Sequence, residues 1–354
     1  MNSHCFKSVK QLILILVFVS SLLLVGCANQ SLRPNPSLIQ SQTPKPVILD
    51  TDMAHEDMFS ALFLLSHPNV DVKAITVSGT GEAHCGPGVS NALGLVTLSS
   101  YEDIPVACGR ETPLAGNHVF PADWRQAADK AYGVKIPAGG AASNLSASDL
   151  IIDILQRSNE TITIVAVGPL TNIADVLQKA PEISAKVKEI YIMGGALEAK
   201  GNVGSSGVNI HNEYAEWNIY IDPAAANIVF KSGIPIVLIP LDATDDVPVT
   251  RNFYKALDKN RNTPTAKLVY EMLTANLDFV DSGGFQFWDS LTSSTFTDQS
   301  IVKFEELNLS VVEEEGPESG RIKQDTSGAK IKVAVSADQS KFEQLFLTVL
   351  NWAD

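Results

Sequence analysis

Four acidic residues stand close together near the start of the chain. Asp50, Asp52, Glu56 and Asp57 directly follow the apolar run Val47-Ile48-Leu49. A short apolar run that ends in polar residues predicts a buried parallel strand, and ligands of open α/β sheets bind at the carboxyl ends of such strands. Neighbouring carboxylates repel one another unless a cation lies among them, and such oxygen ligands suit Ca²⁺ or Mg²⁺. The segment therefore predicts a metal site, and a solvated turn that caps the next helix is the alternative.

An Asp-x-Asp pair after a strand also occurs in other classes of enzyme. Haloacid-dehalogenase-type phosphatases place an aspartate nucleophile at this point, but they usually have Thr or Val where this chain has Ala54. Glycosyltransferases with an Asp-x-Asp site need a nucleotide-sugar domain, for which the sequence gives no supporting pattern. Both alternatives are therefore disfavoured.

Strand-like and helix-like patterns alternate along most of the chain. This alternation predicts a single α/β domain with a mostly parallel, Rossmann-like central sheet covered by helices on both faces. From residue 252 to 296 the pattern is mainly helical, and the acidic segment 311–328 predicts a surface hairpin before a strand at 331–335 and a final helix at 341–350. The other predicted strands are 47–49, 72–77, 104–107, 162–167, 190–193 and 234–239, and helical patterns lie at 146–156, 171–179 and 223–230.

The amino terminus has the pattern of a bacterial export signal. Lys7 and Lys10 precede an almost uninterrupted apolar stretch at residues 12–24, which is short for a membrane span. The ending Leu24-Val25-Gly26-Cys27 resembles a lipobox, in which the cysteine is lipidated, and an uncleaved anchor helix is the alternative. We predict a signal peptide at residues 1–26, a flexible tether at 27–45 with lipidated Cys27, and one folded domain at 46–354.

The lipid would anchor the protein to the membrane of the cell envelope. Ala28 rather than Asp follows the cysteine, which by resemblance to Gram-negative sorting favours the outer membrane if the organism has one. The formal net charge is −14, from 26 Lys and Arg against 40 Asp and Glu. The sequence has no basic patch that could hold phosphates, so nucleic acid binding is excluded.

Two cysteines remain after Cys5 in the predicted signal and Cys27. An exported protein could join Cys85 and Cys108 in a disulfide, because such compartments permit it. The sequence gives no distance between them, so a disulfide and two free thiols both stay open.

The acidic segment resembles the Asp-x-Asp-Pro-Gly-x-Asp-Asp signature of the inosine–uridine-preferring nucleoside hydrolase family. Here it stands as Asp50-Thr51-Asp52-Met53-Ala54-His55-Glu56-Asp57. The resemblance continues in order along the chain and covers roughly residues 46–351. The further segments that resemble this family are Val165-Ala166-Val167-Gly168-Pro169-Leu170-Thr171-Asn172, Met193-Gly194-Gly195, Gly201-Asn202, Ala215-Glu216-Trp217-Asn218, Asp222-Pro223 and Phe287-Trp288-Asp289.

The resemblance implies a calcium-dependent active site. Asp52, Asp57, Asp289 and the backbone carbonyl of Val167 would ligate Ca²⁺, which accepts such oxygens. Asp50 would orient its neighbours or the water through hydrogen bonds. Asp52 would be the general base that activates a calcium-bound water. The residues implied to bind the substrate are Glu56, Asn202, Glu216 and Asn218 at the ribose, and Trp217 and Trp288 at the base.

Several positions depart from the family pattern. Glu56 replaces an Asp that touches the ribose, and Glu82 stands where many members have Asn. Asn212 competes with Asn202, because the loop at residues 203–214 is long. Trp288 replaces a histidine that protonates the leaving base in purine-accepting members, so another acid or an easier leaving group is needed. The candidate acids are His55, His84 and His211.

The resemblance implies hydrolysis of the N-glycosidic bond of ribonucleosides to base and ribose, and salvage of extracellular nucleosides is the expected role. A surface-anchored nucleoside- or ribose-binding lipoprotein with little turnover is the first alternative, and a hydrolase of a different N-riboside is the second. The expected partner is a small nucleoside, and the family commonly forms homo-oligomers.

Overall fold

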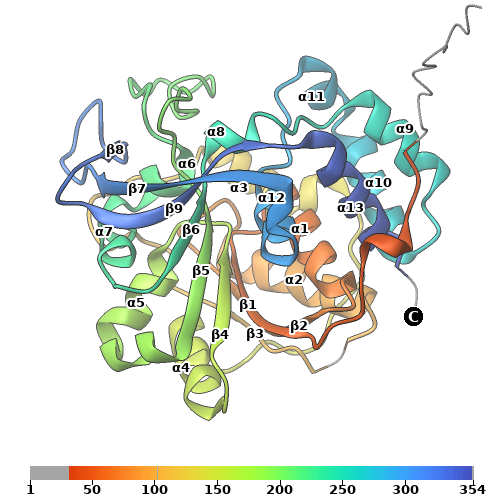
Figure 1. The fold of residues 1–354 in the computed structure, drawn as a ribbon, viewed down its shortest axis with the longest axis horizontal. Helices are drawn as coiled ribbons and strands as arrows, with labels where there is room; N and C mark the ends of the chain where they lie inside the picture. Colours follow the sequence, from red (N-terminus) through yellow and green to blue (C-terminus); the bar gives the residue numbers. More distant parts are fainter. Residues whose placement is uncertain (1–31, 102, 353–354) are drawn as a thin grey trace, which may run out of the picture. The chain divides into compact units, whose positions relative to one another are not determined.

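A nine-stranded, mostly parallel β-sheet runs through the computed structural model of the chain (Figure 1). The structure describes residues 32–352 except residue 102. The strand order is β3-β2-β1-β4-β5-β6-β9-β7-β8; β7 alone runs antiparallel to its neighbours β8 and β9. The strands are β1 Lys45–Thr51, β2 Val70–Val77, β3 Val106–Cys108, β4 Ile162–Ala166, β5 Val187–Met193, β6 Ile236–Ile239, β7 Val302–Val311, β8 Ile322–Gln324 and β9 Ala329–Ala337.

Helices connect the strands and cover both faces of the sheet (Figure 1). The α-helices are α1 His55–Ser66, α2 Cys85–Leu98, α3 Ala122–Asp129, α4 Ala147–Arg157, α5 Thr171–Lys179, α6 Trp217–Ile221, α7 Pro223–Phe230, α8 Leu241–Thr244, α9 Arg251–Lys259, α10 Pro264–Ala275, α11 Leu277–Ser282, α12 Trp288–Thr297 and α13 Gln339–Leu350. Short 3-10 helices lie at Pro36–Leu38, Ala131–Gly133, Pro181–Lys186 and Gln299–Ile301.

The central strands are apolar on both sides because this part of the sheet is buried between two helical layers. In β1, Val47 and Leu49 belong to the core on the side of α1, α12 and α13, whereas Ile48 belongs to the core on the side of α4, α5 and α7. Successive side chains of a strand point to opposite faces, so a strand covered on both faces is apolar throughout. The predicted α/β class, with a mostly parallel sheet covered on both faces, is confirmed.

The expected strands and helices are present, and one long strand was not expected. The acidic segment forms a hairpin, in which Val311 of β7 pairs with Ile322 of β8. The rest of β7 was missed because most of its side chains are exposed or half-buried, so it lacks an apolar run.

Part of the predicted tether lies against the folded domain. The backbone N–H of Asn35 donates to Thr348 Oγ1 at 2.9 Å, and Leu32 and Ile39 pack on the core. These contacts differ from the expectation of a flexible tether up to residue 45. The predicted signal segment 1–26 and Cys27 lie outside the described residues. Within the described part of the chain, we find no helix that is both long and apolar enough to cross a membrane.

A disulfide joins Cys85, the first residue of α2, to Cys108 at the end of β3. The two Cα atoms are 5.5 Å apart. The bond resolves the question that the sequence left open. It fixes the start of α2, which directly follows the loop at residues 78–84, to the edge of the sheet.

We predict that loss of this disulfide lowers thermal stability without changing the fold. The bond closes a loop with a sequence separation of 23 residues. Closure of such a loop removes about 3 kcal/mol of chain entropy from the unfolded state, or about 5 °C in Tm for a domain of this size. Thermal unfolding of the Cys85→Ala/Cys108→Ala double variant, beside the wild type with and without reductant, measures the effect. An unchanged Tm in both comparisons would show that the bond does not form.

Candidate active site

A cavity of about 700 Å³ opens at the carboxyl ends of the central strands. It lies where β1 and β4 are neighbours and the strand order reverses, which is the usual place for ligands in such sheets. Most of the side chains that the sequence predicted for the site line this one cavity. They are Asp52, Glu56, Asp57, Val167, Asn202, Glu216, Trp217, Asn218, Trp288 and Asp289.

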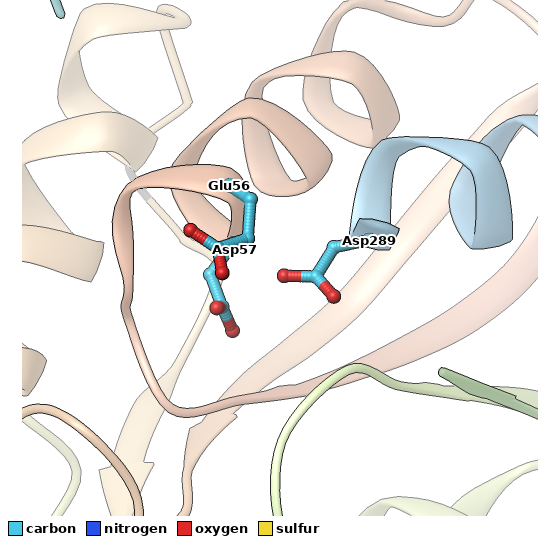
Figure 2. Close-up of side chains that lie close together, drawn as sticks. All are labelled: Glu56, Asp57 and Asp289. Carbon is cyan, nitrogen blue, oxygen red and sulfur yellow. The ribbon is translucent and has the colours of Figure 1, made fainter. Parts of the chain in front are cut away.

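Three carboxylates from two helices meet at the floor of the cavity (Figure 2). Glu56 and Asp57 lie in the first turn of α1, and Asp289 lies in the first turn of α12. One oxygen from each residue lies within 4.8 Å of the others. Helix amino termini carry partial positive charge, which reduces the repulsion between these carboxylates.

The donor set fits a hard cation. Asp289 Oδ2 is buried and has no hydrogen-bond partner among the described residues. A buried, unpaired carboxylate oxygen is costly unless a cation or a proton satisfies it. The carboxylates of this cluster offer only oxygen atoms, as Ca²⁺ and Mg²⁺ prefer.

Asp52 lies beside this cluster but is not one of its three closest members. Its backbone N–H donates to Asp57 Oδ1, and its own Oδ2 accepts from the backbone N–H of Glu82, both at 2.9 Å. Two glycines leave room for the side chain. A Cβ at Gly81 would lie 2.0 Å from Asp52 Cβ, and a Cβ at Gly168 would lie 2.9 Å from the Asp52 nitrogen.

Asp50 lies behind the cavity and supports the strand ends. Its Oδ1 accepts hydrogen bonds from Thr76 Oγ1 at 2.6 Å and from Asn172 Nδ2 at 2.8 Å. The side chain is fully buried, and burial raises its pKa to about 7, although these hydrogen bonds lower it in part. Asp50 therefore has the position expected of a residue that orients its neighbours.

Polar side chains at the start of α6 form another wall. Glu216 caps the helix and accepts from the backbone N–H groups of Asn218 at 2.8 Å and of Gly195 at 2.9 Å. Asn218 Nδ2 donates to the carbonyl oxygen of Val167 at 3.0 Å, which joins α6 to the end of β4. Asn202 Oδ1 accepts from the Trp217 N–H at 3.1 Å. These contacts hold the loop after β5 and the end of β4 next to each other at the start of α6.

Burial and mutual repulsion raise the pKa values of the acids in the cavity. The pKa of Asp57 is raised to about 6 by burial and by the charge of Glu56. Burial and the charge of Asp57 raise the pKa values of Asp52 and Asp289 well above their usual range. Burial also raises the pKa of Glu216 to about 7, against the effect of its backbone hydrogen bonds. A bound cation would oppose all of these shifts.

Aromatic rings enclose His55 at the wall of the cavity. Its ring centroid lies 4.5 Å from that of Tyr132 and 4.4 Å from that of Phe285, and the imidazole contacts the Glu56 carboxylate. Burial lowers the pKa of His55, but the charges of Glu56, Glu82 and Asp57 and the hydrogen bond with Glu56 together raise it by more, so the pKa is raised overall.

Glu82 is held beside this aromatic group. The Tyr132 hydroxyl donates a hydrogen bond to its carboxylate, and the side chain is buried. Burial and the charge of Glu56 raise the pKa of Glu82 to about 8. Tyr132 has a φ of 52°, an unfavourable value for a bulky residue that indicates local strain at the cavity wall.

The structure distinguishes between candidate acids, and between candidate ribose-binding asparagines, that the sequence left as alternatives. His55 lines the cavity, whereas His84 is paired with Asp129 and His211 lies in a separate surface depression. Asn202 lines the cavity, whereas Asn212 lies outside it and bonds within its own loop and to Ser319.

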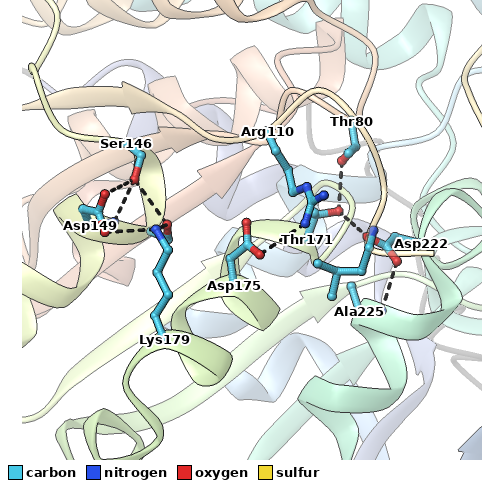
Figure 3. Close-up of polar contacts among 11 residues, drawn as sticks. Thr80, Arg110, Ser146, Asp149, Thr171, Asp175, Lys179, Asp222 and Ala225 are labelled. Carbon is cyan, nitrogen blue, oxygen red and sulfur yellow. Dashed lines mark hydrogen bonds and ion pairs between the residues drawn. The ribbon is translucent and has the colours of Figure 1, made fainter.

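A buried hydrogen-bond chain fixes the loop that carries Gly81 and Glu82. Thr80 Oγ1 lies 3.0 Å from Thr171 Oγ1, which donates to Asp222 Oδ2 at 2.8 Å (Figure 3). Asp222 also caps α7 through the N–H of Ala225 at 3.1 Å. The chain therefore joins the loop after β2 to the starts of α5 and α7.

Sequence reasoning missed the aromatic wall formed by Phe120, Trp124, Tyr132 and Phe279, which all line the cavity. These residues lie in α3, α11 and the adjoining connections, far from the recognised motifs. Their only signal in the sequence is aromatic composition, which equally indicates core packing.

The chain matches a family of known proteins over most of its length. The model of the family described as inosine-uridine preferring nucleoside hydrolase matches residues 47–344. The chain belongs to this family. Membership of the nucleoside hydrolase family supports an enzyme that hydrolyses the N-glycosidic bond of ribonucleosides.

Relatives within the nucleoside hydrolase family differ in the bases that their names specify. The pyrimidine-specific ribonucleoside hydrolase RihA of Escherichia coli O127:H6 is 36% identical over 239 residues, which are 66% of this chain and 72% of RihA. The solved inosine-uridine preferring nucleoside hydrolase of Bacillus anthracis has a TM-score of 0.79 at 25% identity, covering 87% of this chain and 100% of that one. The purine-preferring ribonucleoside hydrolase of Gardnerella vaginalis has a TM-score of 0.75 at 30% identity, covering 87% and 98%.

We predict that Gly81→Ala displaces Asp52 and lowers hydrolysis of ribonucleosides by about 10²-fold, because a shift near 1 Å at a reacting group has effects of that size. The matched control is Gly86→Ala in α2, where an added Cβ meets nothing within 4 Å. Steady-state kinetics of both variants, with circular dichroism to verify folding, measure the effect. Equal activity of the two variants would contradict the close approach at Gly81.

Proposed function

We propose that this protein is a calcium-dependent N-ribosyl hydrolase in which Asp52 is the general base. The observation that carries the proposal is that Asp52, Asp57, Glu216, Asn218 and Asp289, from segments far apart in the sequence, line one cavity. Family membership supports the same reaction.

A calcium ion would be held by carboxylates at the floor of the cavity. Asp57 and Asp289 offer the closest oxygens, Asp52 lies beside them, and the carbonyl of Val167 lines the same cavity. Glu56 belongs to the close cluster as well, so it competes with Asp52 for a place among the ligands. When bound, the ion would supply positive charge that orients water and the ribose hydroxyls.

The reaction requires a base, a held sugar and a stabilised transition state. Asp52 would accept a proton from the water that attacks C1′, since glycosyl transfer to water needs a carboxylate base on the attacking side. Asn202, Glu216 and Asn218 would hold the ribose hydroxyls. Cleavage of the bond between C1′ and the base nitrogen builds positive charge on the ring, which the buried carboxylates favour. Asp50 would keep the strand ends in place.

The base would lie among the aromatic rings. Trp217 and Trp288 both line the cavity and can stack on a base. The indole N–H of Trp288 is not an acid, so Trp288 cannot protonate the leaving group. Of the candidate histidines, only His55 lies in the cavity among the described residues.

We also propose that the protein acts at the cell envelope, anchored through a lipid on Cys27, on nucleosides that arrive from outside the cell. The pattern of residues 1–27 supports this. Homo-oligomer formation remains part of the proposal by resemblance to the family.

We predict that Asp52→Asn lowers kcat by between about 10² and 10⁴, the usual contribution of a general base. Release of ribose from inosine, uridine, cytidine and adenosine with calcium measures it. A variant with full turnover and bound calcium would disprove the role of Asp52. If the wild type binds nucleosides in a calcium-dependent way without releasing ribose, the nucleoside-binding lipoprotein is the better description.

We predict that calcium stabilises the protein more at about pH 8 than at about pH 5. Without metal, the raised pKa values mean that folded Asp57 and its neighbours hold more protons than the unfolded chain above about pH 4. Stability therefore falls as the pH rises through the folded pKa values, and calcium removes this loss by taking the place of protons.

At about one hundred times its Kd, calcium adds about 2.7 kcal/mol, or about 4 °C in Tm for a domain of this size. Thermal unfolding with calcium or chelator at the two pH values tests this. A calcium effect of the same size at both, or larger at the lower pH, would contradict a carboxylate site.

A further inference from the structure

The part of the cavity in which we place the leaving base combines aromatic rings with carboxylates. His55 and Tyr132 are stacked there, and Trp288 and Phe279 line the same cavity. Glu82 is buried beside Tyr132, whose hydroxyl fixes its carboxylate. Aromatic faces and carboxylates together form the kind of site that recognises cations, because both attract positive charge.

The charge of the cavity is strongly one-sided. Seven acidic residues line it, and no lysine or arginine does among the residues that the structure describes. A calcium ion at the floor would offset Asp52, Asp57 and Asp289, and a protonated His55 would offset Glu56, which it contacts. Among the described residues, the side-chain group bonded to the Glu82 carboxylate is the neutral hydroxyl of Tyr132. A carboxylate buried without a cation in direct contact is costly, so a positively charged ring beside Glu82 would be favoured. A phosphorylated substrate would be repelled.

The chemistry of the leaving group is compatible with the same class of substrate. A neutral purine or pyrimidine leaves with the bonding electron pair and needs a proton; Trp288 cannot supply it, and the candidate histidine in the cavity, His55, is in contact with the Glu56 carboxylate. A heterocycle that carries a full positive charge at the glycosidic nitrogen leaves as a neutral molecule with that electron pair and needs no acid. Water supplies the hydroxyl of ribose, and its proton passes to Asp52.

We propose that the preferred substrates are N-ribosides of cationic aromatic heterocycles, such as N-ribosylpyridinium ions, and that Glu82, held by Tyr132, determines this specificity. The proposal rests on the N-ribosyl hydrolase function proposed above and names its substrate class. The ribose would bind as described, and the cationic ring would lie among the aromatic side chains, close to Glu82.

The test compares kcat/KM for N-ribosylpyridinium-3-carboxamide with kcat/KM for uridine, in the wild type and in Glu82→Gln. For each protein, we divide kcat/KM for the cation by kcat/KM for uridine and call the quotient the preference ratio. The cation is intrinsically the more labile compound, but this difference is the same for every variant, so it cancels when the preference ratio of a variant is compared with that of the wild type. We expect the wild type to prefer the cation and Glu82→Gln to lose about tenfold of that preference, because one carboxylate charge near the ring is removed.

Two further variants make the test specific. Asp123→Asn removes a carboxylate from the exposed rim of the same cavity, where solvent screens its charge. The ratio of kcat/KM for the cation to kcat/KM for uridine should therefore change less than in Glu82→Gln. Tyr132→Phe removes the hydroxyl that fixes Glu82 and keeps the charge, so it should lower the ratio by a smaller factor than Glu82→Gln does.

The outcomes separate this proposal from the function on which it rests. Hydrolysis of uridine with no preference for the cation, or a preference that Glu82→Gln leaves unchanged, overturns the substrate class and leaves the hydrolase intact. Failure of wild-type protein with calcium to hydrolyse uridine, inosine or the cation overturns both. A preference for the cation that falls more in Glu82→Gln than in Asp123→Asn supports the proposal, and an equal fall in both variants contradicts the role of Glu82.

Discussion

The repulsion between buried carboxylates is the constraint on which this structure depends. Asp50, Asp52, Asp57 and Asp289 are all almost fully buried within one small region. The fold reduces the cost in several ways: helices begin at the acids, and backbone N–H groups and hydroxyl and amide side chains donate to some of their oxygens. What remains is a buried oxygen without a hydrogen-bond partner on each of Asp50 and Asp289, and a set of raised pKa values, which a bound cation would oppose.

The sheet explains how distant motifs reach this region. The strand order reverses between β1 and β4, so the loops after these strands diverge and leave a space between them. Helix α1 starts directly after β1, and α6 is fastened to the end of β4 by the hydrogen bond from Asn218. The network through Thr171 and Asp222 then fixes the third loop, after β2. Each wall of the cavity is therefore attached to rigid secondary structure.

The fold and the floor of the site could be predicted from the sequence because their signals are local. Apolar runs predicted the buried strands, and the acids after Leu49 predicted that carboxylates gather at the carboxyl end of β1. The aromatic side chains that we place around the leaving nucleobase could not be predicted in this way. Tyr132 lies in an irregular turn with positive φ, and no periodic pattern in the sequence predicts its hydrogen bond to Glu82. Likewise, only three-dimensional distances decide between Asn202 and Asn212 or pair Cys85 with Cys108.

The two outermost strands of the sheet are very short. β3 at one edge and β8 at the other each contain three residues. β3 pairs with residues 75–77 of β2 and β8 with residues 309–311 of β7, so among the described strands the rest of β2 and of β7 has no neighbour on its outer side. Along this exposed part of β7, the side chains of Lys303, Glu305 and Glu306 are charged and exposed, and charged side chains on an edge disfavour pairing with another chain. The sheet therefore limits its own extension by charge as well as by short outer strands.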